Sequence, residues 1–144
     1  MITDTIIIKV LEVIIQIESE NCKNIAHKSD AIGCYGLRPV ALREIGVKPK
    51  LYPKEIQKQH ALQYAKHILK QTKKPTINFL VYAWLNGPFA AKRKQKQYNY
   101  GIVPYRLPFA DHWYLKKYYK LAPKKTLEFE FLPNSYSSPI ALQD

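Results

Sequence analysis

A glutamate, Glu18, closes an apolar stretch near the N-terminus. Apolar residues recur there at steps of three and four, which predicts a helix over Asp4–Glu20. The polar residues of this stretch form one solvent stripe, namely Lys9, Glu12, Gln16 and Glu20. Glu18 lies roughly 160° from Gln16 at about 100° per residue, on the apolar side. An apolar setting raises the pKa of a carboxyl group, as a general acid near neutral pH requires. The alternative is a frayed helix end with Glu18 in water.

Four segments around and after Glu18 resemble, in the same order, those of the soluble lytic transglycosylase and goose-type lysozyme family. That family has a helix ending in Glu-Ser, a glycine-containing segment ending in proline, an Ala-Tyr-Asn-x-Gly-Pro motif and a late tyrosine motif. The matching segments here are Glu18-Ser19, HKSDAIGCYGLRP at 27–39, AWLNGP at 83–88 and PFADHWYL at 108–115. The joint match is much more specific than any single segment.

The resemblance implies a peptidoglycan-cleaving enzyme with Glu18 as its single general acid and base. Glu18 would protonate the glycosidic oxygen between N-acetylmuramic acid and N-acetylglucosamine. Its carboxylate would then take the proton of the muramyl 6-hydroxyl as a 1,6-anhydro ring closes. No metal ion or cofactor is implied. The matching positions predict substrate contacts at Ser19, Tyr35, Gly36, Trp84, Asn86 and Tyr114.

The chain also departs from the family pattern. Gly36 stands where the family has glutamine, Asp30 where it has glycine and Trp84 where it has tyrosine, and Tyr114 comes one residue early. Hydrolysing glycosidases use two carboxylates, and Asp30 is the one placed to approach Glu18. Hydrolysis assisted by Asp30 is therefore an alternative to anhydro-ring formation. A lysozyme-like structural or wall-binding protein that has lost activity is another.

The segments that carry these residues are mostly predicted as helices. We expect helices over 4–20, 40–45, 53–71, 75–85 and 108–121, with a tight turn or short hairpin at Gly33 and Gly36. The fourth is apolar nearly all round, which is typical of the buried centre of a fold. The expected fold class is mainly α, an α+β lysozyme-like single domain over residues 1–125. A strand-like segment (TLEFEFL) and an irregular tail fill residues 126–144.

The net charge of +12, from 23 basic and 11 acidic residues, indicates a polyanionic partner such as nucleic acid, an anionic membrane or bacterial cell wall. The basic run Ala91–Gln97 is either a solvated face or a wall-binding surface. Aromatic residues interleaved with lysines from Trp113 to Lys120 can stack nucleobases. A basic nucleic-acid-binding helical domain is thus a further alternative, although no standard DNA-reading motif is present.

No targeting signal or membrane-spanning segment is predicted. The apolar run Ile6–Ile17 is interrupted by polar residues and is shorter than the roughly 20 residues that span a bilayer. A wall-acting enzyme of this kind would be delivered by a phage particle or a secretion apparatus, whose proteins are then expected partners. Cys22 and Cys34 flank the loop after the first helix, and the lack of an export signal favours two free thiols over a disulfide.

Overall fold

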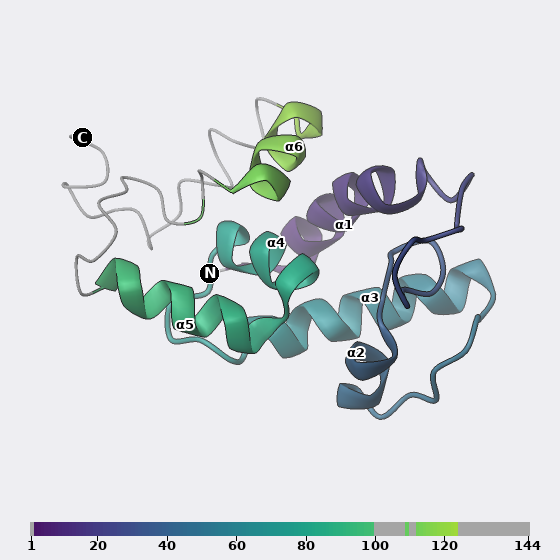
Figure 1. The fold of residues 1–144 in the computed structure, drawn as a ribbon, viewed down its shortest axis with the longest axis horizontal. Coiled ribbons are helices and arrows are strands. Elements are labelled where there is room, and N and C mark those ends of the chain that lie inside the picture. The colour runs from purple at the N-terminus through teal and green to yellow at the C-terminus, as the bar shows by residue number, and fades with distance from the viewer. Residues whose placement is uncertain (1, 100–108, 110–111, 124–144) are drawn as a thin grey trace. The chain divides into compact units, whose positions relative to one another are not determined.

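The computed structural model describes residues 2–99, 109 and 112–123, which are mainly α-helical as predicted (Figure 1). Its helices are α1 (Asp4–Ser19), α2 (Pro39–Glu44), α3 (Lys54–Leu69), α4 (Ile77–Asn86), α5 (Pro88–Asn99) and α6 (Trp113–Leu121). The chain divides into a first unit, Asp4–His67, and a second unit, Ile68–Asp144 with residues 1–3. The strand and tail expected at 126–144 lie outside the described residues. Within the described ranges, no helix combines the length and apolarity needed to cross a membrane.

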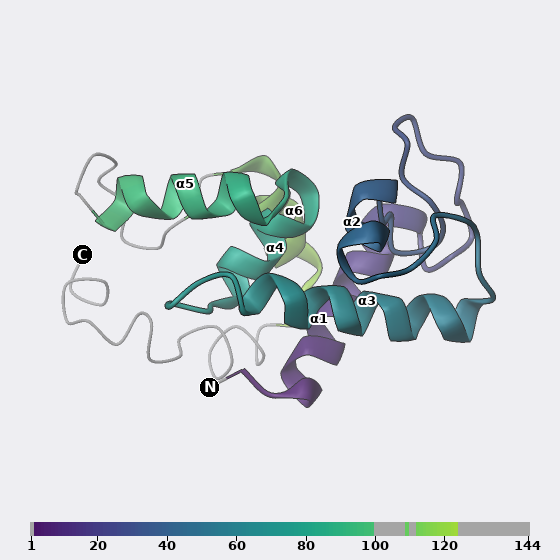
Figure 2. The same ribbon diagram turned by 90° about the horizontal axis from the view of Figure 1, so that it is seen from below.

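Helix α1 forms the apolar centre of the first unit. Its buried side chains are Ile7, Val10, Leu11, Val13, Ile14, Ile15 and Ser19. The predicted solvent stripe is confirmed, because Lys9, Glu12, Gln16 and Glu20 are all exposed. Helix α1 crosses α3 (Figure 2), and Asp4 Oδ2 lies 2.9 Å from Lys66 Nζ. The hydrophobic periodicity of α1 therefore determines which of its faces packs inside this unit.

Helix α1 ends one residue earlier than predicted, at Ser19. The Ser19 hydroxyl donates to Ile15 O at 3.0 Å and accepts the N–H of Cys22 at 2.8 Å. The next three residues, Glu20, Asn21 and Cys22, have φ angles of 50°, 64° and 72°. This left-handed run stops the helix and turns the chain back.

Helix α4 is the buried centre of the second unit. Seven of its ten residues are buried, in agreement with the predicted apolar helix: Ile77, Asn78, Phe79, Leu80, Val81, Ala83 and Trp84. Thr76 caps its N-terminus, accepting the N–H of Phe79 at 2.9 Å. Helix α4 packs against both α5 and α6 (Figure 1). The Tyr119 hydroxyl of α6 donates to the buried Asn78 side chain, which satisfies the polar group inside this core.

Two helices differ clearly from the prediction. Helix α5 was not predicted, because its basic sequence has no apolar periodicity; Pro88 in its first turn and the alanines that follow favour the helix locally. Helix α6 begins at Trp113 rather than at Pro108, because His112 Nδ1 accepts the N–H of Tyr114 at 3.1 Å and caps the helix there. The bounds of α2, α3 and α4 agree with the prediction to within two residues.

Candidate active site

The Glu18 carboxyl lies directly over a glycine. Glu18 is partly buried in the last turn of α1, and Gly36 has a φ of +65°. A Cβ built on Gly36 would lie 2.9 Å from Glu18 Cδ and 3.2 Å from Cγ, closer than side chains normally pack. Glycine at this position therefore makes room for the carboxyl.

Gly36 belongs to a short turn that the sequence predicted correctly. The N–H of Ile32 donates to Leu37 O at 2.8 Å, in an isolated antiparallel bridge. Inside it, the N–H of Gly36 donates to Gly33 O at 3.3 Å, and Gly33 has a φ of +77°. We call residues 32–37 the glycine turn. Its left-handed positions require glycine because other residues are strained there.

Gln57 of α3 holds the glycine turn from one side. Its side-chain oxygen accepts the N–H of Cys34 at 2.7 Å, while its nitrogen donates to Tyr52 O at 2.7 Å. A Cβ on Gly33 would lie 2.9 Å from Gln57 Cδ, so this amide also needs a glycine beneath it. Both hydrogen-bonding ends of the Gln57 amide are thus used, which fixes its orientation as well as the turn.

His27 holds the same turn from its own loop. Its Nε2 lies 2.7 Å from Gly33 O, and since a carbonyl only accepts, Nε2 carries the proton. Sequence reasoning missed the role of both His27 and Gln57. Gln57 is 23 residues from Cys34, its hydrogen-bond partner, and no local pattern connects positions so far apart.

A disulfide joins Cys22 to Cys34, with their Cα atoms 4.7 Å apart. The preference for free thiols is therefore corrected. The left-handed residues after α1 carry Cys22 back to the glycine turn, where Cys34 is buried. The bond ties the end of the helix that bears Glu18 to the turn beneath its carboxyl.

Removal of this disulfide is expected to destabilise the protein substantially. The cysteines are 12 residues apart, and closing a loop of this length contributes about 3 kcal/mol. The double variant C22A/C34A should therefore lose about 3 kcal/mol of unfolding free energy in urea titrations. Wild-type protein in excess reductant is the control and should lose a similar amount. Unchanged stability in reductant would show that the thiols are not paired.

Two other predicted residues of the first unit, Ser19 and Asp30, have contacts within the chain that the structure shows. Ser19 is buried and its hydroxyl is used within the chain, so it ends the helix instead of facing a sugar. The Asp30 side chain is 66% exposed and lies 3.8 Å from Arg38 Nε. A solvated carboxylate next to arginine suits an ion pair on the surface.

Tyr35 is buried and contributes to a separate hollow of about 260 Å³ between α1 and α3. Burial raises the pKa of its phenol, and the carboxylates of Glu12 and Glu55 raise that pKa further. The phenol therefore stays protonated at neutral pH. Neither carboxylate was expected here from the sequence, because 43 positions separate them.

The remaining predicted contacts belong to the second unit. Trp84 is 7% exposed on α4, and Tyr114 is 1% exposed on α6. Asn86 is exposed at the end of α4, and its side-chain nitrogen donates to Tyr82 O at 3.2 Å. Tyr114 is thus a core residue of this unit, whereas Asn86 is open to solvent.

No protein-family model, curated protein or solved structure matches this chain. The likeness to lytic transglycosylases consequently stays a prediction made from four sequence segments. The geometry that bears on it is local to the first unit: a partly buried carboxyl, a glycine that admits it and a turn held in several ways. Such a fixed setting for one carboxyl is what acid catalysis requires.

Proposed function

We propose that the chain is a peptidoglycan lytic transglycosylase with Glu18 as its only catalytic carboxyl. The observation that carries this proposal is the position of the Glu18 carboxyl over Gly36, where a side chain on residue 36 would collide with that carboxyl. The glycine turn is held by Gln57, His27 and a disulfide, which would keep the surface beneath the carboxyl in place. Catalysis gains from such placement because the reacting groups do not have to be ordered during the reaction.

The reaction uses the same carboxyl group in two successive proton transfers, first as an acid and then as a base. Protonated Glu18 would give its proton to the glycosidic oxygen between N-acetylmuramic acid and N-acetylglucosamine as the bond from muramyl C1 breaks. The resulting Glu18 carboxylate would accept the proton of the muramyl 6-hydroxyl, whose oxygen bonds to C1. The products are a 1,6-anhydromuramyl end and a free N-acetylglucosamine 4-hydroxyl. Glu18 ends protonated, so the cycle is complete without water.

One observation supports this reaction over hydrolysis, and a second fits action at the cell wall. Asp30, the expected second carboxylate, is largely solvated and sits beside Arg38, which is a poor setting for activating a water molecule within a site. The Cys22–Cys34 disulfide is of the kind that persists in oxidising surroundings outside the cytosol. Delivery by a phage particle or secretion apparatus is part of the same proposal.

A digest of purified peptidoglycan, with products weighed by mass spectrometry, tests the proposal. The expected products are anhydro-muropeptides. Products heavier by one water would mean hydrolysis, and would direct attention to Asp30 as a second carboxylate.

A second candidate is a wall-binding protein without activity. The observation in its favour is Gly36, because the family glutamine is missing from the segment next to the acid. This candidate would sediment with peptidoglycan and release no soluble fragments. It makes no use of the fitted space around the Glu18 carboxyl, which is why we rank it second.

A further inference from the structure

The chain directly after α1 has a backbone conformation that its residues do not favour. The three residues Glu20, Asn21 and Cys22 have φ angles of 50°, 64° and 72°, and we call them the left-handed run. Left-handed backbone is disfavoured for residues that carry a Cβ, so three such residues in succession without a glycine are strained. Strained backbone of this kind persists only where the surrounding contacts hold it.

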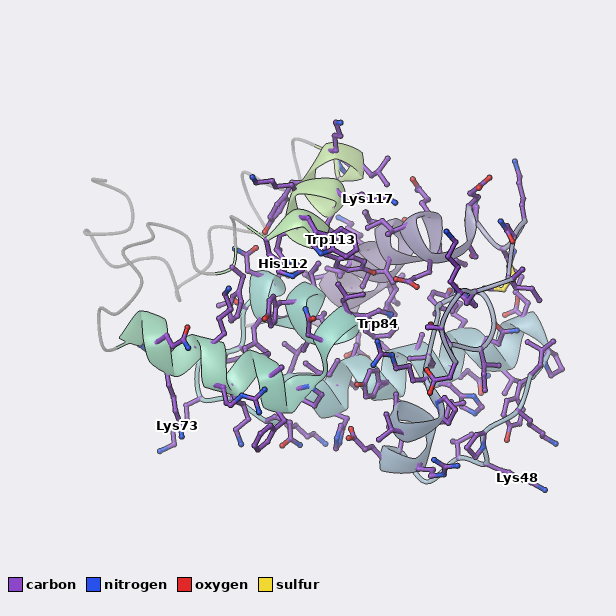
Figure 3. The ribbon with its side chains drawn as sticks, in the orientation of Figure 1. Lys48, Lys73, Trp84, His112, Trp113 and Lys117 are labelled. Carbon is purple, nitrogen blue, oxygen red and sulfur yellow. A yellow bond between two sulfur atoms is a disulfide. The ribbon has the colours of Figure 1, made fainter. Side chains whose placement is uncertain are left out.

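The disulfide of Cys22 is the covalent contact that holds the left-handed run (yellow bond in Figure 3). On the helix side, the N–H of Cys22 donates to the Ser19 hydroxyl at 2.8 Å, and the N–H of Asn24 donates to Ser19 O at 2.9 Å. At the other end of the bond, Cys34 is buried and its N–H donates to Gln57 of α3. The disulfide therefore attaches a strained segment to a well-held point of the glycine turn.

The Glu18 carboxyl depends on both ends of this disulfide. Glu18 lies in the last turn of α1, two residues before the left-handed run, and its carboxyl lies over Gly36, two residues after Cys34. When the disulfide is reduced, the left-handed run can relax to conformations that its residues favour. Helix ends fray readily, so the last turn of α1 loosens with the run. The position of the carboxyl over Gly36 then depends on the oxidation state of the two cysteines.

We propose that Cys22 and Cys34 form a thiol–disulfide exchange site whose oxidised form is the active one. Cys22 is partly exposed whereas Cys34 is 1% exposed, so an attacking thiolate reaches the Cys22 sulfur and Cys34 leaves as a thiolate. In the opposite direction, an external disulfide takes two electrons and two protons from the cysteine thiols and leaves as two thiols. The effect on activity rests on the proposed function. Reducing surroundings would keep the enzyme inactive until it reaches oxidising ones.

Digests of peptidoglycan with oxidised and with dithiothreitol-reduced full chain test the inference. The reduced protein should keep its helical circular dichroism and cleave on the order of 100-fold more slowly, because a displacement of about 1 Å can cost that much in rate. Oxidised glutathione should restore the rate. Hydrogen exchange of the amides of residues 20–24 should become faster on reduction, whereas that of the amides in α3 should change little.

The variant Glu20→Gly separates relaxation of the left-handed run from other effects of reduction. Glycine adopts a φ of 50° without strain, so the run should keep its conformation better when the disulfide is absent. Reduced Glu20→Gly should therefore cleave roughly tenfold faster than reduced wild type, the factor that corresponds to the strain of one left-handed residue. The matched control is reduced Glu20→Gln, which also lacks the carboxylate and should cleave as slowly as reduced wild type.

Three outcomes would overturn the inference: a folded reduced protein that cleaves within twofold of the oxidised one, unchanged hydrogen exchange at residues 20–24, or loss of all helical structure on reduction. The last would mean that the disulfide only stabilises the fold. An oxidised protein without activity would instead contradict the proposed function. Hydrogen exchange would still decide in that case whether the disulfide holds the end of α1, so the two failures are distinguishable.

Discussion

The variant Glu18→Gln is expected to lower the rate of peptidoglycan cleavage roughly 100- to 10,000-fold, the range contributed by a positioned general acid. Glutamine keeps the size of the side chain, so the space above Gly36 stays filled, but the amide has no proton to give to the glycosidic oxygen. Release of anhydro-muropeptides, quantified by mass spectrometry over time, measures the effect.

The matched control for this variant is Glu20→Gln. Glu20 follows the same helix two residues later and is exposed, and its substitution makes the same change from a carboxyl group to an amide. It should leave the cleavage rate within about twofold of wild type, because it alters only a solvated charge. Equal loss in both variants would mean that charge, and not the acid of Glu18, determines the rate.

The second large effect is expected for Gly36→Ala. The new methyl group would occupy the space of the Glu18 carboxyl, which must move aside. A displacement of about 1 Å can cost on the order of 100-fold in rate. The left-handed φ of +65° adds strain of about 1–2 kcal/mol. Cleavage rate and unfolding free energy, measured on the same preparation, separate the two effects.

Gly46→Ala provides the control for backbone strain. Gly46 has a φ of +75°, and a Cβ there meets no atom within 4 Å. This variant should lose a similar 1–2 kcal/mol of stability and keep its cleavage rate. A Gly36→Ala protein as active as Gly46→Ala would argue that the carboxyl over the turn takes no part in catalysis.

Sequence alone predicted those features that depend on local patterns. The face of α1 is determined by a helical periodicity, and the glycine turn by residues that tolerate positive φ, so both were predicted correctly. Glu18 could be assigned to the partly buried side of its helix for the same reason. Helix α5 was missed because a helix that is polar on most sides has no apolar repeat to detect.

The remaining features of the candidate site depend on contacts between distant positions. Gln57 meets the glycine turn only once α3 has folded back on it, and nothing near Gln57 in the sequence indicates this. The disulfide was judged from the absence of an export signal, whereas its formation follows from the reversal of the chain after α1. Ser19 was assigned to substrate by resemblance, although its hydroxyl is used to end the helix.

The several attachments of the glycine turn have a consequence for hydrogen exchange. The N–H groups of Ile32 and Cys34 are hydrogen-bonded to Leu37 O and to Gln57, and the disulfide restrains the same segment. A segment held in this way opens with a free energy close to that of global unfolding. Its amide protons should therefore exchange only when the first unit unfolds, and loss of activity on heating should coincide with that unfolding.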